Sequence, residues 1–117
     1  MVGYLFAGQG SQYIGMGKDL YESFPVARDV FTKADAALGF SLSTLCFEGP
    51  QEELTKTNNS QPAILTMSIA CFKALAALSG DTWQPAYLAG LSLGEYSALV
   101  AAEAVAFLGP GDELILI

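Results

Sequence analysis

The sequence contains no histidine, and this absence limits the chemistry that the chain can perform by itself. A serine nucleophile needs a nearby base, and histidine is the side chain that most often supplies one. The two cysteines, Cys46 and Cys71, show neither CxxC nor Cys/His spacing, so no metal ion is expected. Both lie in apolar helical patterns, which predicts two buried free thiols in a reducing cytoplasm.

Charged residues are also scarce, at 15% of the 117 residues, whereas hydrophobic residues make up 52%. Either some apolar surface is covered by a second segment or a partner chain, or the chain forms a compact, Ala-rich α/β core. Five Lys and Arg against twelve Asp and Glu give a net charge of −7. This charge argues against nucleic acid and anionic membrane surfaces as partners, and an anionic substrate would need a local positive site.

No export signal or membrane span is expected. Met1 is followed directly by a strand-like run without a basic n-region, and no apolar stretch approaches the roughly 20 residues that a span needs. The length allows at most one domain with a modest core. We therefore expect a cytoplasmic chain without a membrane partner.

The order of apolar runs and turn signals predicts an α/β fold with a parallel sheet. Strands are expected at residues 2–7 and 86–89, and helices at about 16–23, 25–38, 50–54, 62–78 and 93–107. Residues 58–60 are predicted as a loop, and the apolar run at 114–117 is expected to pack inside this fold or inside something larger. The helical stripes expected to be buried are Ala27, Val30, Phe31, Ala34 and Leu38, then Ile64, Met67, Cys71, Leu75 and Leu78.

The most informative stretch is Gly90-Leu91-Ser92-Leu93-Gly94, which is typical of a serine nucleophile on a strand-to-helix elbow. The glycines allow the sharp turn and let the helix pack close to the strand. The serine would then lie at the positive end of a helix, beside backbone N–H groups that are free to meet developing negative charge. The pattern is weak alone, as is the glycine loop at residues 8–12, which also fits a tight turn.

Three segments together resemble the malonyl-CoA:acyl carrier protein transacylase family, which includes the acyltransferase domains of fatty acid and polyketide synthases. They are FAGQGSQ at residues 6–12, SQPA at 60–63 and GLSLGEYSAL at 90–99. The resemblance implies that residues 1–117 form the N-terminal part of an α/β-hydrolase-like core, with a small ferredoxin-like subdomain inserted after it. It also implies that an acyl group moves from acyl-CoA to the serine and then to the phosphopantetheine thiol of an acyl carrier protein, without a further cofactor.

By position in these motifs, Ser92 matches the family's nucleophile, and Gln9 and Leu93 match the residues whose backbone N–H groups form the oxyanion hole. Gln61 matches a glutamine that lines the acyl pocket. Leu91 stands where the family usually has a histidine that contacts the acyl group. The family's arginine for the malonyl carboxylate would fall roughly 25 residues past the serine, where this chain has Ile117, and its catalytic histidine lies in a later part.

Several functions remain open at this point. The chain is part of a transferase that a second chain completes with histidine and arginine, a fragment that keeps the fold but not the chemistry, or a module that binds acyl groups or a carrier protein. An independent serine hydrolase and a structural domain with a fortuitous motif are further alternatives.

Overall fold

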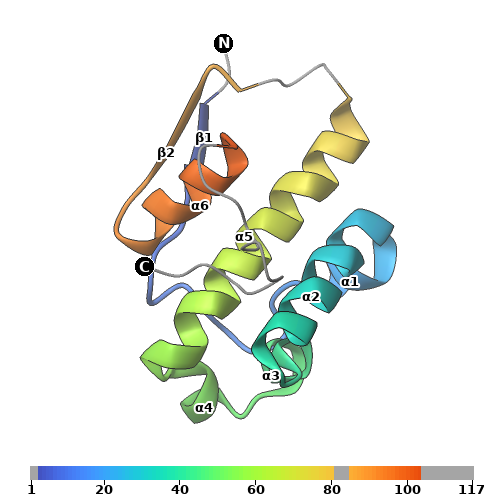
Figure 1. Cartoon of the computed structure of the whole chain (residues 1–117), viewed down its shortest axis with the longest axis vertical. Helices are drawn as coiled ribbons and strands as arrows, with labels where there is room; N and C mark the ends of the chain where they lie inside the picture. Colours follow the sequence, from blue (N-terminus) through green and yellow to red (C-terminus); the bar gives the residue numbers. More distant parts are fainter. Residues whose placement is uncertain (1–2, 81–84, 104–117) are drawn as a thin grey trace.

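The computed structural model describes residues 3–80 and 85–103 (Figure 1). Within them two short strands lie beside a set of helices. The strands are β1 (Gly3–Phe6) and β2 (Tyr87–Gly90), and the helices are α1 (Lys18–Ser23), α2 (Pro25–Leu38), α3 (Leu42–Glu48), α4 (Gln51–Thr55), α5 (Thr57–Ser79) and α6 (Leu93–Ala101). The predicted end of the last helix and the apolar run at 114–117 lie outside the described residues.

The two strands pair in parallel, as the sequence predicts, with Gly3 opposite Tyr87 and Phe6 opposite Gly90. Because parallel strands end at the same edge of a sheet, the glycine loop after β1 and the turn after β2 leave the sheet side by side. The strand order therefore brings the first and third sequence motifs to one place in the fold.

The long helix α5 occupies the middle of the molecule and contacts each of the other described helices (Figure 1). It begins at Thr57, so the predicted loop at residues 58–60 is wrong. The backbone N–H groups of Asn59 and Ser60 both donate to the Lys56 carbonyl, at 2.8 and 2.7 Å, and close a first helical turn. Pro62, which cannot donate, follows at the sixth helical position.

The core lies between α5 and the helices of the first half. The stripe predicted for α2 is buried at Ala27, Val30, Phe31 and Ala34, with Leu38 partly buried, and Gly39 ends the helix at a φ of 77°. Phe31 packs its ring against Tyr21 and Phe47, with ring centroids 6.0 and 5.3 Å away.

The buried side of α5 differs from the predicted stripe. Ile64 is buried, Met67 and Leu75 are half-buried, and Cys71 and Leu78 are exposed. The fully or nearly fully buried apolar residues of the helix also include Ala63, Leu65, Ile69, Ala70 and Ala74. The predicted stripe fails because it faces a groove beside β1, whereas α2 and α6 pack on other sides of the helix.

The two cysteines therefore differ in burial. Cys46 is buried as predicted, and burial, assisted by the nearby Asp35 carboxylate, raises the pKa of its thiol to about 12. Cys71 is exposed, so the prediction of two buried thiols is wrong for this residue. Its position on the open side of α5 explains the difference.

The expectation about membrane-spanning length also needs correction. The 23-residue α5 is long and apolar enough to cross a membrane, judged by length and composition alone. The central helix of a soluble protein meets the same criterion, and α5 packs here against helices on several sides.

Candidate functional site

A sharp turn joins β2 to α6, and Ser92 forms that turn. The strand ends at Gly90, the helix begins at Leu93, and Ser92 has φ 57° and ψ −119°. A positive φ is uncommon for a residue other than glycine and marks a strained backbone. The predicted strand–turn–helix elbow is confirmed, with the serine at its tip.

The two flanking glycines are required by the close approach of backbone segments. A Cβ at Gly94 would overlap the Phe6 carbonyl oxygen of β1, and a Cβ at Gly90 would overlap the backbone of Gly94. Because these neighbours are backbone atoms, they cannot rotate away as a flexible side chain could. The glycines thus hold α6 tightly against the ends of both strands.

The glycine loop after β1 lies directly against this elbow. A Cβ at Gly8 would lie 2.7 Å from the Leu91 carbonyl oxygen and 3.9 Å from the Ser92 Cβ atom. The loop is held by its own hydrogen bonds, since the hydroxyl of Ser11 donates to the Gly8 carbonyl at 2.7 Å. Gly8 therefore lies beside Ser92, and Gln9 follows it directly in the loop.

Two backbone donors of this region have no acceptor among the described residues. They are the N–H groups of Gln9, in the loop, and Leu93, at the first position of α6. The Gln9 side chain is turned to another element, because its Nε2 donates to the Thr57 Oγ1 at the start of α5, at 3.2 Å. This hydrogen bond ties the glycine loop to the central helix.

The Ser92 hydroxyl is exposed and is not used to cap the helix that it precedes. It stands at the N-terminal end of α6, where the helix dipole favours negative charge. Glu95 lies in the first turn of the same helix, and its N–H donates to the Ser92 carbonyl at 3.0 Å. The hydroxyl is thus accessible to a substrate, in a position where an oxyanion would be stabilised.

Of the remaining predicted site residues, Leu91 directly precedes the serine and Gln61 lies on α5. The Leu91 side chain is 79% exposed immediately before Ser92. Gln61 is half-buried on α5, four positions after Thr57, so the two share one face of the helix. The structure therefore gathers Leu91, Ser92 and Leu93 beside the Gln9 loop.

Sequence reasoning missed Thr57, because no local pattern reveals a contact across 48 positions of the chain. The chain contains no histidine that could serve as the base for Ser92. In residues 3–80 and 85–103, no three His, Cys, Asp or Glu side chains come together as a metal site would require.

Comparison with known protein families matches most of the chain to one family. Residues 3–109 match the family described as the acyl transferase domain. The chain is 57% identical over 106 residues to a malonyl CoA-acyl carrier protein transacylase of Bacillus subtilis, covering 91% of this chain and 32% of that protein. It is 47% identical over 104 residues to the Escherichia coli protein of the same name, covering 89% and 33%.

Solved structures that resemble this chain are also transacylases. A malonyl CoA-acyl carrier protein transacylase from Clostridium perfringens superposes with a TM-score of 0.84 at 44% identity, covering 91% of this chain and 33% of that one. A type II polyketide synthase acyl carrier protein in complex with its malonyl-transacylase gives a TM-score of 0.83 at 44% identity, covering 91% and 34%. The chain spans about a third of the length of the relatives it matches.

Proposed function

The chain belongs to the acyl transferase domain family, and on that premise we propose that it supplies the nucleophile-bearing N-terminal part of a malonyl or acyl transferase. In this proposal residues 1–117 are one portion of an α/β-hydrolase-like core. The portion acts within a larger or complemented protein that contributes a base and a cation for the acyl carboxylate. The substrates are acyl-CoA and an acyl carrier protein, and the setting is cytoplasmic.

The proposed reaction has two transfers through Ser92. Its Oγ attacks the thioester carbonyl of malonyl-CoA while its proton passes to a base from outside this chain. The N–H groups of Gln9 and Leu93 donate to the oxyanion of the tetrahedral intermediate, and the coenzyme A thiolate then leaves and takes a proton. The thiol of the carrier protein attacks the acyl-serine in the same way, forming a new thioester and restoring the hydroxyl.

One observation carries this proposal more than any other. The Ser92 backbone is held at φ 57°, between two glycines that no larger residue could replace without moving backbone atoms. A fold has no structural need for such a strained serine with an exposed hydroxyl, whereas an exposed nucleophile does require it. Leu91 and Gln61 are proposed to contact the acyl group, since one is exposed directly before Ser92 and the other lies on the helix that anchors the Gln9 loop.

Malonyl-CoA and acyl carrier protein are proposed because the relatives' names specify malonyl transfer and one neighbouring structure is a complex with a carrier protein. The chemistry also requires a cation for the malonyl carboxylate. Arg28 is the only arginine of the chain, and its side chain donates to the backbone carbonyls of Tyr21 and Glu22. In this proposal the arginine that pairs with the carboxylate therefore comes from outside this chain.

A second candidate is a catalytically incomplete fragment that binds an acyl group or a carrier protein. The absence of histidine favours it, because Ser92 alone is a poor nucleophile near neutral pH. The two candidates differ in whether a covalent acyl-serine forms once the missing portion is present.

The test uses a chimera in which this chain is followed by the portion of the Bacillus subtilis relative that lies beyond its matched segment. The chimera and the 117-residue chain are each incubated with malonyl-CoA and analysed by intact mass and peptide mapping. We expect one malonyl group on Ser92 of the chimera, and no substantial labelling of the chain alone.

Ser92→Ala should abolish the adduct, while Ser23→Ala, at an exposed serine on α1, should leave it unchanged. A folded chimera that binds malonyl-CoA without acylation would favour the second candidate. Labelling at a residue other than Ser92 would overturn the assignment of the nucleophile.

A further inference from the structure

Two side chains of the glycine loop hydrogen-bond to the backbone on either side of Gln9. The hydroxyl of Ser11 donates to the Gly8 carbonyl at 2.7 Å, and the Ser11 N–H adds a longer bond to the same carbonyl, at 3.3 Å. The N–H of Gly10 donates to the Gln12 Oε1 at 2.8 Å. Both peptide groups that flank the Cα atom of Gln9 are therefore held by a side chain of the loop itself.

The peptide group between Gly8 and Gln9 contains both the carbonyl that Ser11 holds and the N–H that is proposed to bind the oxyanion. This peptide bond is trans. A trans peptide group is planar, so its carbonyl and its N–H point in opposite directions. A hydroxyl that fixes the carbonyl therefore fixes the direction of the N–H as well. Accepting a hydrogen bond at the carbonyl also polarises the amide and strengthens its N–H as a donor.

The same peptide group begins beside the elbow and is followed by a held bend. A Cβ at Gly8 would lie 3.9 Å from the Ser92 Cβ atom. Gly10 adopts φ 105°, and a Cβ at this position would meet no atom within 4 Å. The direction of the backbone, and not a lack of space, therefore calls for glycine at Gly10, and the Gln12 amide holds that direction.

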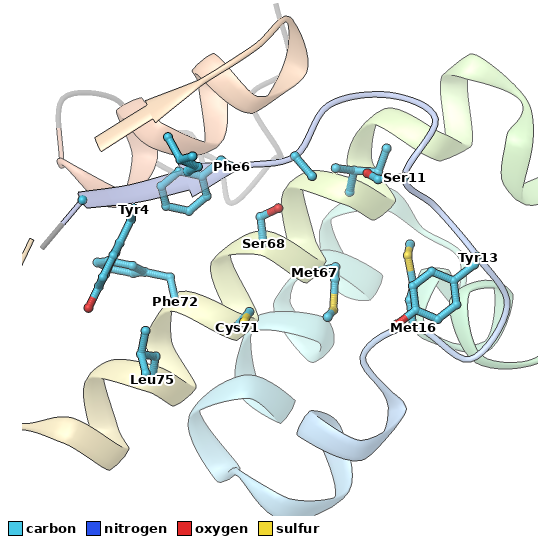
Figure 2. A pocket seen from close by; sticks show the side chains of 14 residues that line it. Tyr4, Phe6, Ser11, Tyr13, Met16, Met67, Ser68, Cys71, Phe72 and Leu75 are labelled. Atoms are coloured by element: carbon cyan, nitrogen blue, oxygen red, sulfur yellow. The ribbon is translucent and has the colours of Figure 1, made fainter. Parts of the chain in front are cut away.

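Ser11 reaches the loop from the side of an apolar groove of about 490 Å³ between β1 and α5 (Figure 2). Ala7 and Ser11 bring this groove to the glycine loop, whereas none of residues 90–94 lines it. The Ser11 hydroxyl is thus linked to the elbow through the peptide group of Gly8 and Gln9.

We infer that Ser11 is a positioning residue for the proposed acyl transfer. Its hydroxyl holds the Gly8 carbonyl so that the Gln9 N–H is aligned before the oxyanion forms, and Gln12 supports it by fixing the next peptide group. The inference rests on the proposed function for the identity of the oxyanion. It goes beyond that proposal by giving a role to a side chain that does not touch the reacting atoms.

The test compares Ser11→Ala, which removes the hydroxyl, with Ser11→Thr, which keeps one. Acylation of Ser92 is followed in the chimera described above, by rapid quenching and intact mass, over a range of malonyl-CoA concentrations. Removing a whole oxyanion donor lowers rates by about 100- to 1,000-fold. Because Ser11→Ala leaves the Gln9 N–H in place and only frees its direction, we expect a loss of about 10-fold in the maximal rate.

Other readouts distinguish positioning from a structural role. The half-saturating concentration of malonyl-CoA should stay unchanged in Ser11→Ala, because oxyanion donors act in the transition state more than on the bound substrate. Its urea midpoint should also stay nearly unchanged, since Ser11 is exposed. Ser11→Thr should keep most of the rate, and Ser23→Ala, at an exposed serine on α1, should keep all of it.

A second acyl donor, p-nitrophenyl acetate, separates this inference from the proposed function, because it has neither a carboxylate nor a coenzyme A portion. Attack by the Ser92 Oγ forms acetyl-serine and releases nitrophenolate, while the serine proton passes to the base. Acetylation about 10-fold slower in Ser11→Ala, in a chimera that does not react with malonyl-CoA, would support the positioning role and refute malonyl transfer.

The remaining outcomes are equally decisive. Malonylation at the same rate in the unsubstituted chimera and in Ser11→Ala would overturn the positioning role while supporting the proposed function. An equal loss of rate in Ser11→Ala and Ser11→Thr would also overturn it, because the hydroxyl would then not be the cause. A folded chimera in which neither donor acylates Ser92 would refute both proposals.

Discussion

Replacing Ser92 by glycine should stabilise the fold while removing the proposed nucleophile. The residue is held at φ 57° and ψ −119°, which glycine adopts without the steric penalty that a Cβ brings. Its hydroxyl is exposed and does not cap α6, so truncation to alanine removes no described hydrogen bond but keeps the strain. Comparing Ser92→Gly with Ser92→Ala therefore isolates the backbone contribution.

The size of the effect follows from two opposing quantities. A non-glycine residue in such a backbone conformation costs about 1–3 kcal/mol. Glycine, in turn, loses more conformational entropy on folding, which costs about 0.5–1 kcal/mol. We expect Ser92→Gly to be more stable than Ser92→Ala by about 1 kcal/mol, which corresponds to a rise of roughly 0.3–1 M in the urea midpoint.

Urea unfolding followed by circular dichroism measures this difference in the 117-residue chain, and Ser23 supplies the control. That residue ends α1 in an ordinary helical conformation, so Ser23→Gly should be less stable than Ser23→Ala. The reasoning would be refuted if the stability difference between the glycine and alanine variants had the same sign at both positions, because glycine would then act only through the unfolded chain. A Ser92→Gly variant less stable than Ser92→Ala would show that the elbow stores no strain.

Three further predictions concern other parts of the structure. Gly94→Ala should destabilise the chain by about 1–3 kcal/mol in the same urea assay, because its Cβ would overlap the Phe6 carbonyl oxygen and force α6 away from β1. Gly3→Ala on β1, where a Cβ would make only ordinary contacts at 3.9 Å or more, is the control. Thr57→Val should remove the hydrogen bond to the Gln9 side chain and lower the rate of Ser92 acylation in the chimera several-fold, whereas Thr57→Ser should keep both the hydrogen bond and the rate. Equal acylation rates for the two variants would show that this hydrogen bond does not position the glycine loop. Burial raises the pKa of the Cys46 thiol from 9.0 to about 12, so the unfolded chain releases this proton first. The free energy of unfolding should therefore fall as the pH rises from about 9 to 12. In Cys46→Ala this free energy should fall less steeply with pH, and an identical pH dependence in both proteins would contradict the shift.

The elbow was predictable because each of its requirements is local. Gly90, Ser92 and Gly94 are close in sequence, and the apolar strand before them and the helix after them are visible in the same short window. The parallel pairing of β1 and β2 follows from the order of elements along the chain. The resemblance to acyltransferases extends this local information to Gln9, 83 positions before Ser92, which spacing alone could not connect.

The features that escaped prediction depend on contacts between distant segments. Asn58 and Asn59 have turn-forming propensity, yet α5 begins before them, at Thr57, because the Lys56 carbonyl accepts from two successive N–H groups. The buried side of α5 was mistaken because apolar spacing shows that a face avoids water but not which neighbour covers it. The Gln9–Thr57 hydrogen bond has no local signature for the same reason.

The high apolar and low charged content of the chain also has a structural explanation. The sequence left open whether its excess of apolar residues fills a compact core or covers surface meant for another segment. Leu5 is 86% exposed and Tyr87 is 65% exposed, and both lie on the sheet face opposite the one that Tyr4 and Phe6 present to α5. Parallel sheets are rarely left with one apolar face in water. These exposed side chains therefore favour the second interpretation, in which another segment covers apolar surface of this chain, and they agree with the proposal that a larger or complemented protein supplies the base for Ser92.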